Sequence, residues 1–86
     1  MDIQQAIERV KSIKTRHEAD LFKKANVVGV GVGYIWRQGQ LTDDIGLVVN
    51  VRRKVPLAQL AEEDVIPEEL DGVEVDVNEV GDIRPY

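Results

Sequence analysis

Serine and histidine, the side chains that most often form a nucleophile–base pair, occur once each in this sequence, as Ser12 and His17. A hydroxyl nucleophile needs a base within hydrogen-bond distance. Two helical residues five positions apart point about 140° apart around the axis, so they do not meet. The sequence therefore predicts no catalytic residue, and we expect that this chain is not an enzyme. His17 is interpreted as a boundary residue of the first helix.

Metal ligands are also poorly represented. The chain has no cysteine, which excludes disulfides and thiolate sites together, and a single histidine has no partner at ligand spacing. Seven of its sixteen acidic residues are neighbours in the chain, and neighbouring acids point in different directions: Asp43-Asp44, Glu62-Glu63-Asp64 and Glu68-Glu69. We therefore expect solvated acidic surface, with no metal site and no cofactor.

Glycines occupy three alternate positions, Gly29, Gly31 and Gly33, a spacing that partly matches the glycine-rich loop of a nucleotide-binding site. The dinucleotide fingerprint requires a glycine where this sequence has Tyr34, and it requires a turn into a helix. Here the pattern continues as a strand. Glycine weakens a strand, so a row of three on one face predicts close packing against another backbone, such as a helix.

The charges are unevenly distributed. Residues 1–60 hold ten Lys or Arg and six Asp or Glu, whereas residues 61–86 hold one Arg and ten acids. This polarity predicts pairing between the two parts or an acidic face for a partner. The one basic cluster, Arg52-Arg53-Lys54, is too small to predict nucleic-acid binding. No apolar run is long enough to predict a membrane-spanning helix. We take two aromatic residues and the basic cluster as the candidate interaction surface: Tyr34, Trp36, Arg52, Arg53 and Lys54.

The elements that position these residues begin with a helix. Asp2 followed by Gln5 is typical of a helix cap with its reciprocal partner. From there on, residues of one helix face recur every three or four positions. Together they form one largely apolar stripe: Ile3, Ala6, Ile7, Val10, Ile13, His17 and Leu21. This predicts a helix of about 22 residues, with Lys23 and Lys24 in its last turn.

Strand periodicity follows. Residues 26–36 alternate, with Val28, Val30, Val32, Tyr34 and Trp36 on the face opposite the glycines, and Gly39 predicts the turn of a hairpin. A second strand is expected at about 44–53 and a third at 73–77, after the turn signal Asp71-Gly72. A short helix is predicted between them at 57–63, and another helical turn from Ile66-Pro67.

The predicted fold class is α+β, in the order α-β-β-α-β with a small three-stranded mixed or antiparallel sheet. The long connection predicts a third strand parallel in direction to the second. We expect the glycine-rich strand in the centre. Residues 1–80 form a single domain, and residues 81–86 form a tail or the start of a linker.

Three segments carry a family resemblance: Asn26 to Tyr34, Leu47 to Pro56, and Ile66 to Gly81. In order and spacing they resemble the N-terminal region that precedes the protease domain of bacterial trypsin-like serine peptidases. That resemblance implies a non-catalytic accessory domain that packs on or positions a downstream protease domain. No catalytic residue of that family falls within this chain.

Two alternatives stay open beside the accessory role. One is a stand-alone interaction or oligomerisation module that uses an edge strand or the acidic part of the chain. The other is a prodomain that assists or blocks its protease. The expected partner is the protease domain, another protein or a second copy of the chain, and the expected compartment is the cytoplasm.

Overall fold

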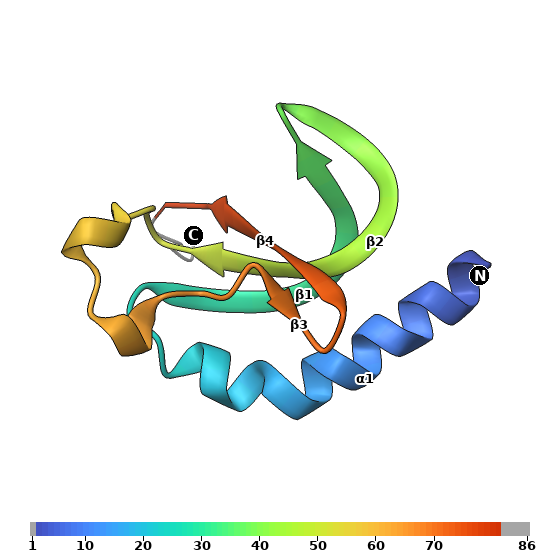
Figure 1. The fold of residues 1–86 in the computed structure, drawn as a ribbon, viewed down its shortest axis with the longest axis horizontal. Coiled ribbons are helices and arrows are strands. Elements are labelled where there is room, and N and C mark those ends of the chain that lie inside the picture. The colour runs from blue at the N-terminus through green and yellow to red at the C-terminus, as the bar shows by residue number, and fades with distance from the viewer. Residues whose placement is uncertain (1, 82–86) are drawn as a thin grey trace, which may run out of the picture.

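The computed structural model describes residues 2–81 and has a single long helix packed on a four-stranded sheet (Figure 1). The α+β class is confirmed, but the sheet has four strands instead of three. The elements are α1 (Ile3–Phe22), β1 (Val27–Arg37), β2 (Gln40–Val51), the 3-10 turns η1 (Leu57–Gln59) and η2 (Glu62–Asp64), β3 (Glu69–Leu70) and β4 (Val73–Glu79).

Helix α1 begins as its sequence predicts. The Asp2 carboxylate accepts a hydrogen bond from the Gln5 backbone N–H at 2.8 Å, which satisfies one of the free donors of the first turn. Val10, Ile13 and Leu21 of the apolar stripe are buried. The helix ends at Phe22, so Lys23 is its C-cap and does not lie in the last turn.

The sheet order is β1-β2-β4-β3. β1 and β2 form the predicted antiparallel hairpin, and β4 runs parallel to β2, as predicted. The position of the glycine-rich strand was predicted wrongly, because β2 is central and β1 lies at an edge. β2 carries Leu47 and Val49 with no exposed surface, and such a strand gains most from neighbours on both sides.

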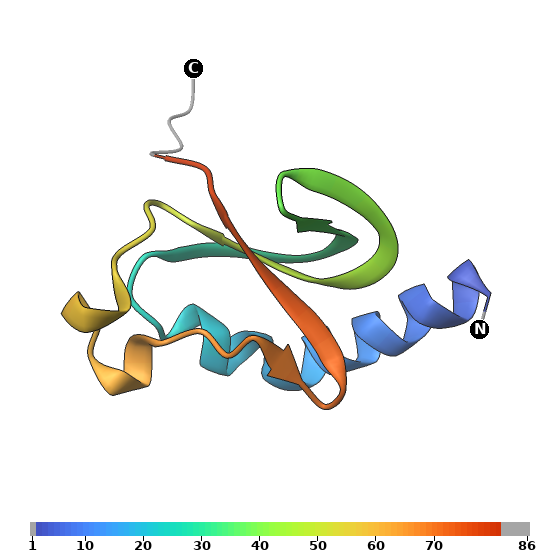
Figure 2. The same cartoon turned by 45° about the horizontal axis from the view of Figure 1, so that its top comes forward.

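The hydrophobic core lies between α1 and the valine face of the sheet. Figures 1 and 2 show the helix along one face, beneath β1 and β2. Val30 and Val32 pack against this core, as do Val27 and Ile45. Its buried members are Val10, Ile13, Leu21, Leu47, Val49, Val51, Val73 and Val75.

The glycine row faces away from the helix, so the predicted close packing of a helix against Gly29, Gly31 and Gly33 is wrong. A Cβ atom on Gly31 would meet no atom within 4 Å. At Gly29 and Gly33 the nearest atoms belong to the Asn50 and Val48 side chains of β2, at 3.3 Å. The valine row on the other face already supplies the contact with the helix, which leaves the glycine row uncovered by it.

The far half of the hairpin curls over this second face of the sheet (Figure 2). Ile35 is buried there, with 1% of its surface exposed, outside the main core. The Trp36 backbone N–H donates to Asp76 of β4 at 3.1 Å, and the Arg37 guanidinium donates to Glu74 of the same strand. The curl therefore brings the hairpin tip across β2 to β4.

The connection from β2 to β4 is mostly irregular. The helix predicted at 57–63 is replaced by the two short 3-10 turns, and residues after Pro67 enter β3 instead of a helical turn. Pro56 and Pro67 restrict the chain to extended geometry and limit helix length. The turns Gln38-Gly39 and Asp71-Gly72 both have positive φ at their two residues, as tight hairpins require.

Two further sequence predictions concern the ends and the membrane. Apart from Gly81, the tail predicted at 81–86 lies outside the described residues. Over residues 2–81, no helix combines the length and apolar character needed to cross a membrane.

Candidate functional site

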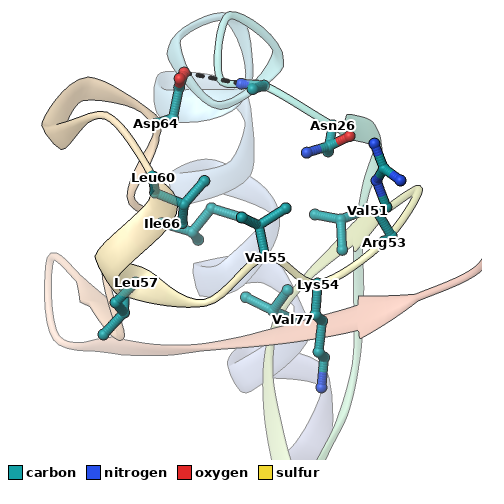
Figure 3. Close-up of a pocket in the computed structure, with 11 residues that line it drawn as sticks. Asn26, Val51, Arg53, Lys54, Val55, Leu57, Leu60, Asp64, Ile66 and Val77 are labelled. Atoms are coloured by element: carbon teal, nitrogen blue, oxygen red, sulfur yellow. Dashed lines mark hydrogen bonds between the residues drawn. The ribbon is translucent and has the colours of Figure 1, made fainter.

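A cavity of about 300 Å³ opens at the carboxyl ends of β2 and β4 (Figure 3). It lies between these strand ends and residues 52–68, which join β2 to β3 and are called the connecting segment below. Most of its wall is aliphatic, contributed by Val51, Val55, Leu57, Leu60, Ile66 and Val77. The volume falls at the lower end of the range of small-molecule sites, which are concave and largely apolar.

Fixed contacts hold the connecting segment in place over this cavity. The Asp64 carboxylate accepts a hydrogen bond from the Ala25 backbone N–H at 2.9 Å, and Lys24 donates to the Glu63 carbonyl oxygen at 2.7 Å. At the other end of the segment, the Lys54 backbone N–H donates to Glu79 at 2.6 Å. The cavity is therefore built between anchored chain segments.

The hydrogen-bond donors of the cavity lie apart from its carboxylate. Figure 3 shows the Asn26 amide and the Arg53 guanidinium at one end, with the Asp64 carboxylate across from them. Among residues 2–81, neither the Asn26 nor the Arg53 side chain has a hydrogen-bond or ion-pair partner. The Lys54 side chain points away from this end (Figure 3). Two free donor groups thus stand beside an apolar surface.

Asn26 also has a conformational role. Its φ of 71° lies in the left-handed region, where asparagine and glycine are tolerated best. Its carbonyl oxygen accepts a hydrogen bond from the Arg52 backbone N–H at 2.8 Å. The backbone is thereby fixed, and the side-chain amide is left available to the cavity.

A second surface is the outer edge of β1. Within the described part of the chain, β1 pairs only with β2. The side-chain hydrogen bonds to the backbone of its curled end come from Thr42, which donates to the Ile35 carbonyl oxygen, and from Asp76, which accepts from the Trp36 N–H. In an antiparallel pair, alternate residues of an edge strand direct their N–H and C=O groups outward. Along most of β1 these outward backbone groups have no strand partner in the described part of the chain.

The predicted interaction residues do not form a single patch. Tyr34 and Trp36 lie on the curled half of the hairpin, where Trp36 pairs with Leu41 and both are 55% exposed. Arg52, Arg53 and Lys54 follow the opposite end of β2, and all three are exposed. Only Arg53 and Lys54 of this group line the cavity.

Ion pairs join the basic and acidic parts of the chain. Asp71 accepts from Arg16 at 3.0 Å and lies 2.8 Å from the His17 Nε2 atom, with the same oxygen serving both. The His17 hydrogen bond, followed by that of Arg16, lowers the pKa of the Asp71 carboxyl. Arg37 bonds to Glu74 and Asp44, and these carboxylates raise the pKa of its guanidinium. Some of the basic and acidic side chains therefore pair with each other within the domain.

Catalytic and metal-binding groups are not assembled in the described residues. No hydrogen bond among residues 2–81 joins Ser12 to His17, because His17 turns toward Asp71. In the same range, no cluster of three or more His, Asp or Glu side chains could hold a metal ion.

The sequence reasoning missed the cavity as a site. Its wall uses Leu57, Leu60 and Ile66, which belong to a segment that was read only as short helix. A usable signal was the presence of three large aliphatic residues in a stretch bounded by Pro56 and Pro67. Such a segment cannot form a long amphipathic helix, so its apolar residues must pack one by one against the strand ends.

Comparison with known families corrects the resemblance drawn from the sequence. A comparison with curated proteins finds no significant match. The family model that matches is the NARROW LEAF 1 N-terminal domain, over residues 5–80, which include most of α1 and all four strands. The assignment to the N-terminal region of bacterial trypsin-like peptidases is therefore wrong, and the accessory role inferred from it falls with it. The chain belongs to the NARROW LEAF 1 N-terminal domain family.

Proposed function

We propose that this chain is a non-catalytic protein-association domain that pairs with a second copy of itself through the outer edge of β1. The observation that carries the proposal is the length of that edge. β1 has eleven residues and is hydrogen-bonded on one side only within the described chain. The separation of Ser12 from His17 supports the non-catalytic part. We also propose action in the cytoplasm, on the strength of the cysteine-free composition.

Between its two register shifts, the edge of β1 lacks the charges and prolines that commonly keep strands from associating. Exposed edges are commonly protected by charged residues, proline or a very short strand. Residues 27–36 contain neither a charge nor a proline. The opposite side of the sheet is different, because β3 has only two residues and contains Glu69. The contrast supports a pairing role for β1 in particular.

A second copy fits this edge because residues 29–33 of β1, Gly-Val-Gly-Val-Gly, are symmetric about Gly31. An antiparallel pair with its two-fold axis at Gly31 places Gly29 opposite Gly33 and Val30 opposite Val32. Val30 and Val32 of the two copies then meet on the helix-covered face, and the three glycines of one copy meet glycines of the other on the opposite face. No like charges oppose one another along residues 27–35.

The absence of cysteine makes a sharp test available. Cα atoms of directly opposed residues in an antiparallel pair lie about 4.5–5.5 Å apart, within the range that a disulfide spans. We expect Gly31→Cys chains to form crosslinked dimers under mild oxidation. We also expect a mixture of Gly29→Cys and Gly33→Cys chains to crosslink to each other faster than either does to itself.

Ser12→Cys is the matched control, because Ser12 is exposed and lies on α1, outside β1. In sedimentation equilibrium, the parent chain should dimerise with rising concentration, whereas Gly31→Lys should remain monomeric through charge repulsion at the axis. A parent chain that stays monomeric from micromolar to millimolar concentration contradicts the proposal. So does a Gly31→Cys crosslinking rate equal to that of Ser12→Cys.

A further inference from the structure

We infer that the cavity at the carboxyl ends of β2 and β4 binds a small aliphatic monocarboxylate, with its carboxylate held by Arg53 and Asn26. The inference is independent of the association through β1, since the cavity shares no residue with that edge between Val27 and Arg37. Three properties of the cavity favour such a ligand: its aliphatic wall, the donor groups of Arg53 and Asn26, and the placement of its charges.

The wall determines the apolar part of the ligand. Val51 and Val77 come from the strands, and Leu60 and Ile66 come from the connecting segment that faces them. Leu60 and Ile66 are only half-buried, and Leu57 is 72% exposed. A branched aliphatic chain between these surfaces would remove apolar area from water on both sides, which is the main source of affinity in such sites.

The donors determine the charged part. Arg53 provides a fork of N–H groups that matches a carboxylate, and the Asn26 amide adds a neutral donor beside it (Figure 3). Neither side chain has a partner among residues 2–81. One cation at this end favours an anion of single charge over a phosphate or a dicarboxylate.

The acidic group fixes the orientation. Asp64 stands across the cavity from Asn26 and Arg53, and one of its oxygens is already bonded to the Ala25 N–H. It repels a carboxylate at its own end, so that the ligand's charge lies beside Arg53. The aliphatic chain then extends over Val55 and Leu60.

The test uses 4-methylpentanoate as the probe and follows the amide resonances of Asn26, Arg53 and Val55 in NMR titrations of the full chain. We expect saturable shifts at these residues. Arg53→Gln should weaken binding roughly ten- to hundredfold, as expected for loss of a charge-assisted hydrogen bond. Asn26→Gly, which keeps the left-handed backbone, should weaken it by a smaller factor.

Lys11→Gln is the control, because Lys11 is an exposed cation on α1 that does not line the cavity, and the affinity of this variant should stay within about twofold of the parent. Neutral 4-methylpentanamide should bind the parent more weakly, and this difference should disappear in Arg53→Gln. Equal affinity for acid and amide, equal effects of the Arg53 and Lys11 changes, or no saturable shift would each overturn the inference. A peptide with a free C-terminal leucine that bound more than tenfold tighter would also overturn it, and would assign the cavity to a protein terminus.

Discussion

A Cβ atom on Gly46 would overlap the side chain of Ile35 and would lie 2.6 Å from the carbonyl oxygen of Glu74. Gly46 thus marks the place where the curled hairpin, β2 and β4 come closest. Ile35 fills the space above this glycine and is almost fully buried. The tight backbone approach that the sequence assigned to the row Gly29, Gly31 and Gly33 occurs here instead.

We expect Gly46→Ala to be strongly destabilising. The new methyl group meets a backbone oxygen that cannot move without disturbing the pairing of β2 and β4. Overpacking of this kind costs about 1–3 kcal/mol or more. Urea denaturation of the two proteins measures the change. A variant with parental stability would show that the hairpin can lift away from β2.

Gly31→Val, unlike Gly46→Ala, is expected to raise the free energy of unfolding. Nothing lies within 4 Å of a Cβ atom at this position, and Gly31 pairs with Val48 across the hairpin. Replacing glycine in a strand by a β-branched residue should therefore stabilise the fold by about 0.5–1 kcal/mol. The same denaturation experiment tests it, at low concentration to separate folding from association. A loss of more than about 1 kcal/mol would contradict the open environment of Gly31.

The Asp71 cluster predicts a pH dependence. Hydrogen bonds from His17 and Arg16 lower the pKa of Asp71 in the folded chain, so the folded state binds the proton less readily than the unfolded state. The stabilisation is therefore present above the unfolded pKa, about 3.9, and is lost as the pH falls through the folded value. Asp71→Asn tolerates the φ of 51° and removes the charge. The stability difference between parent and variant should shrink as the pH is lowered from 5 toward 2, and a constant difference would refute the assignment.

Asp64→Ala should loosen the connecting segment. Its carboxylate is bonded to the Ala25 N–H, a long-range contact between this segment and the end of α1. We expect a loss of about 1 kcal/mol in unfolding free energy, the usual contribution of such a hydrogen bond. Hydrogen exchange should increase at residues 57–66 more than in β1 or β2. The neighbouring Glu62→Ala, which removes an exposed carboxylate without such a bond, is the control.

Local features were predictable from the sequence because short-range rules determine them. The Asp2 cap, the apolar stripe of α1 and the hairpin turn at Gly39 each depend on residues a few positions apart. The order of the strands depends instead on which partner a strand finds after a connection of many residues. For β1, composition alone favoured the centre, and only the pairing of β4 with β2 places it at the edge.

The bulges of β1 explain why the sequence did not fully predict which of its side chains lie on which face of the sheet. Register shifts occur between Val27 and Gly29 and between Tyr34 and Trp36. Each extra residue breaks the simple alternation of faces, so Val27 joins the residues packed on the core. The alternation of residue types shows no sign of these shifts, and the burial of Ile35 could not be anticipated from it.

The cavity was unpredictable for a related reason. Asn26, Arg53 and Ile66 lie far apart in the chain, and they meet only because the connecting segment returns across the ends of the strands. Their residue types are ordinary for turns and loops. Function at such a site depends on tertiary geometry, which local sequence patterns do not contain.

The parallel pairing of β4 with β2 has a consequence for synthesis on the ribosome. When residues up to Val51 have left the exit tunnel, the hairpin and α1 can already form, but β2 still has an open side. Val73 and Val75 complete the core only after the connecting segment and β4 have followed. Long-range parallel contacts form slowly, and unpaired strands favour aggregation. We therefore expect the nascent chain to depend most on protection by chaperones between the emergence of β2 and that of β4.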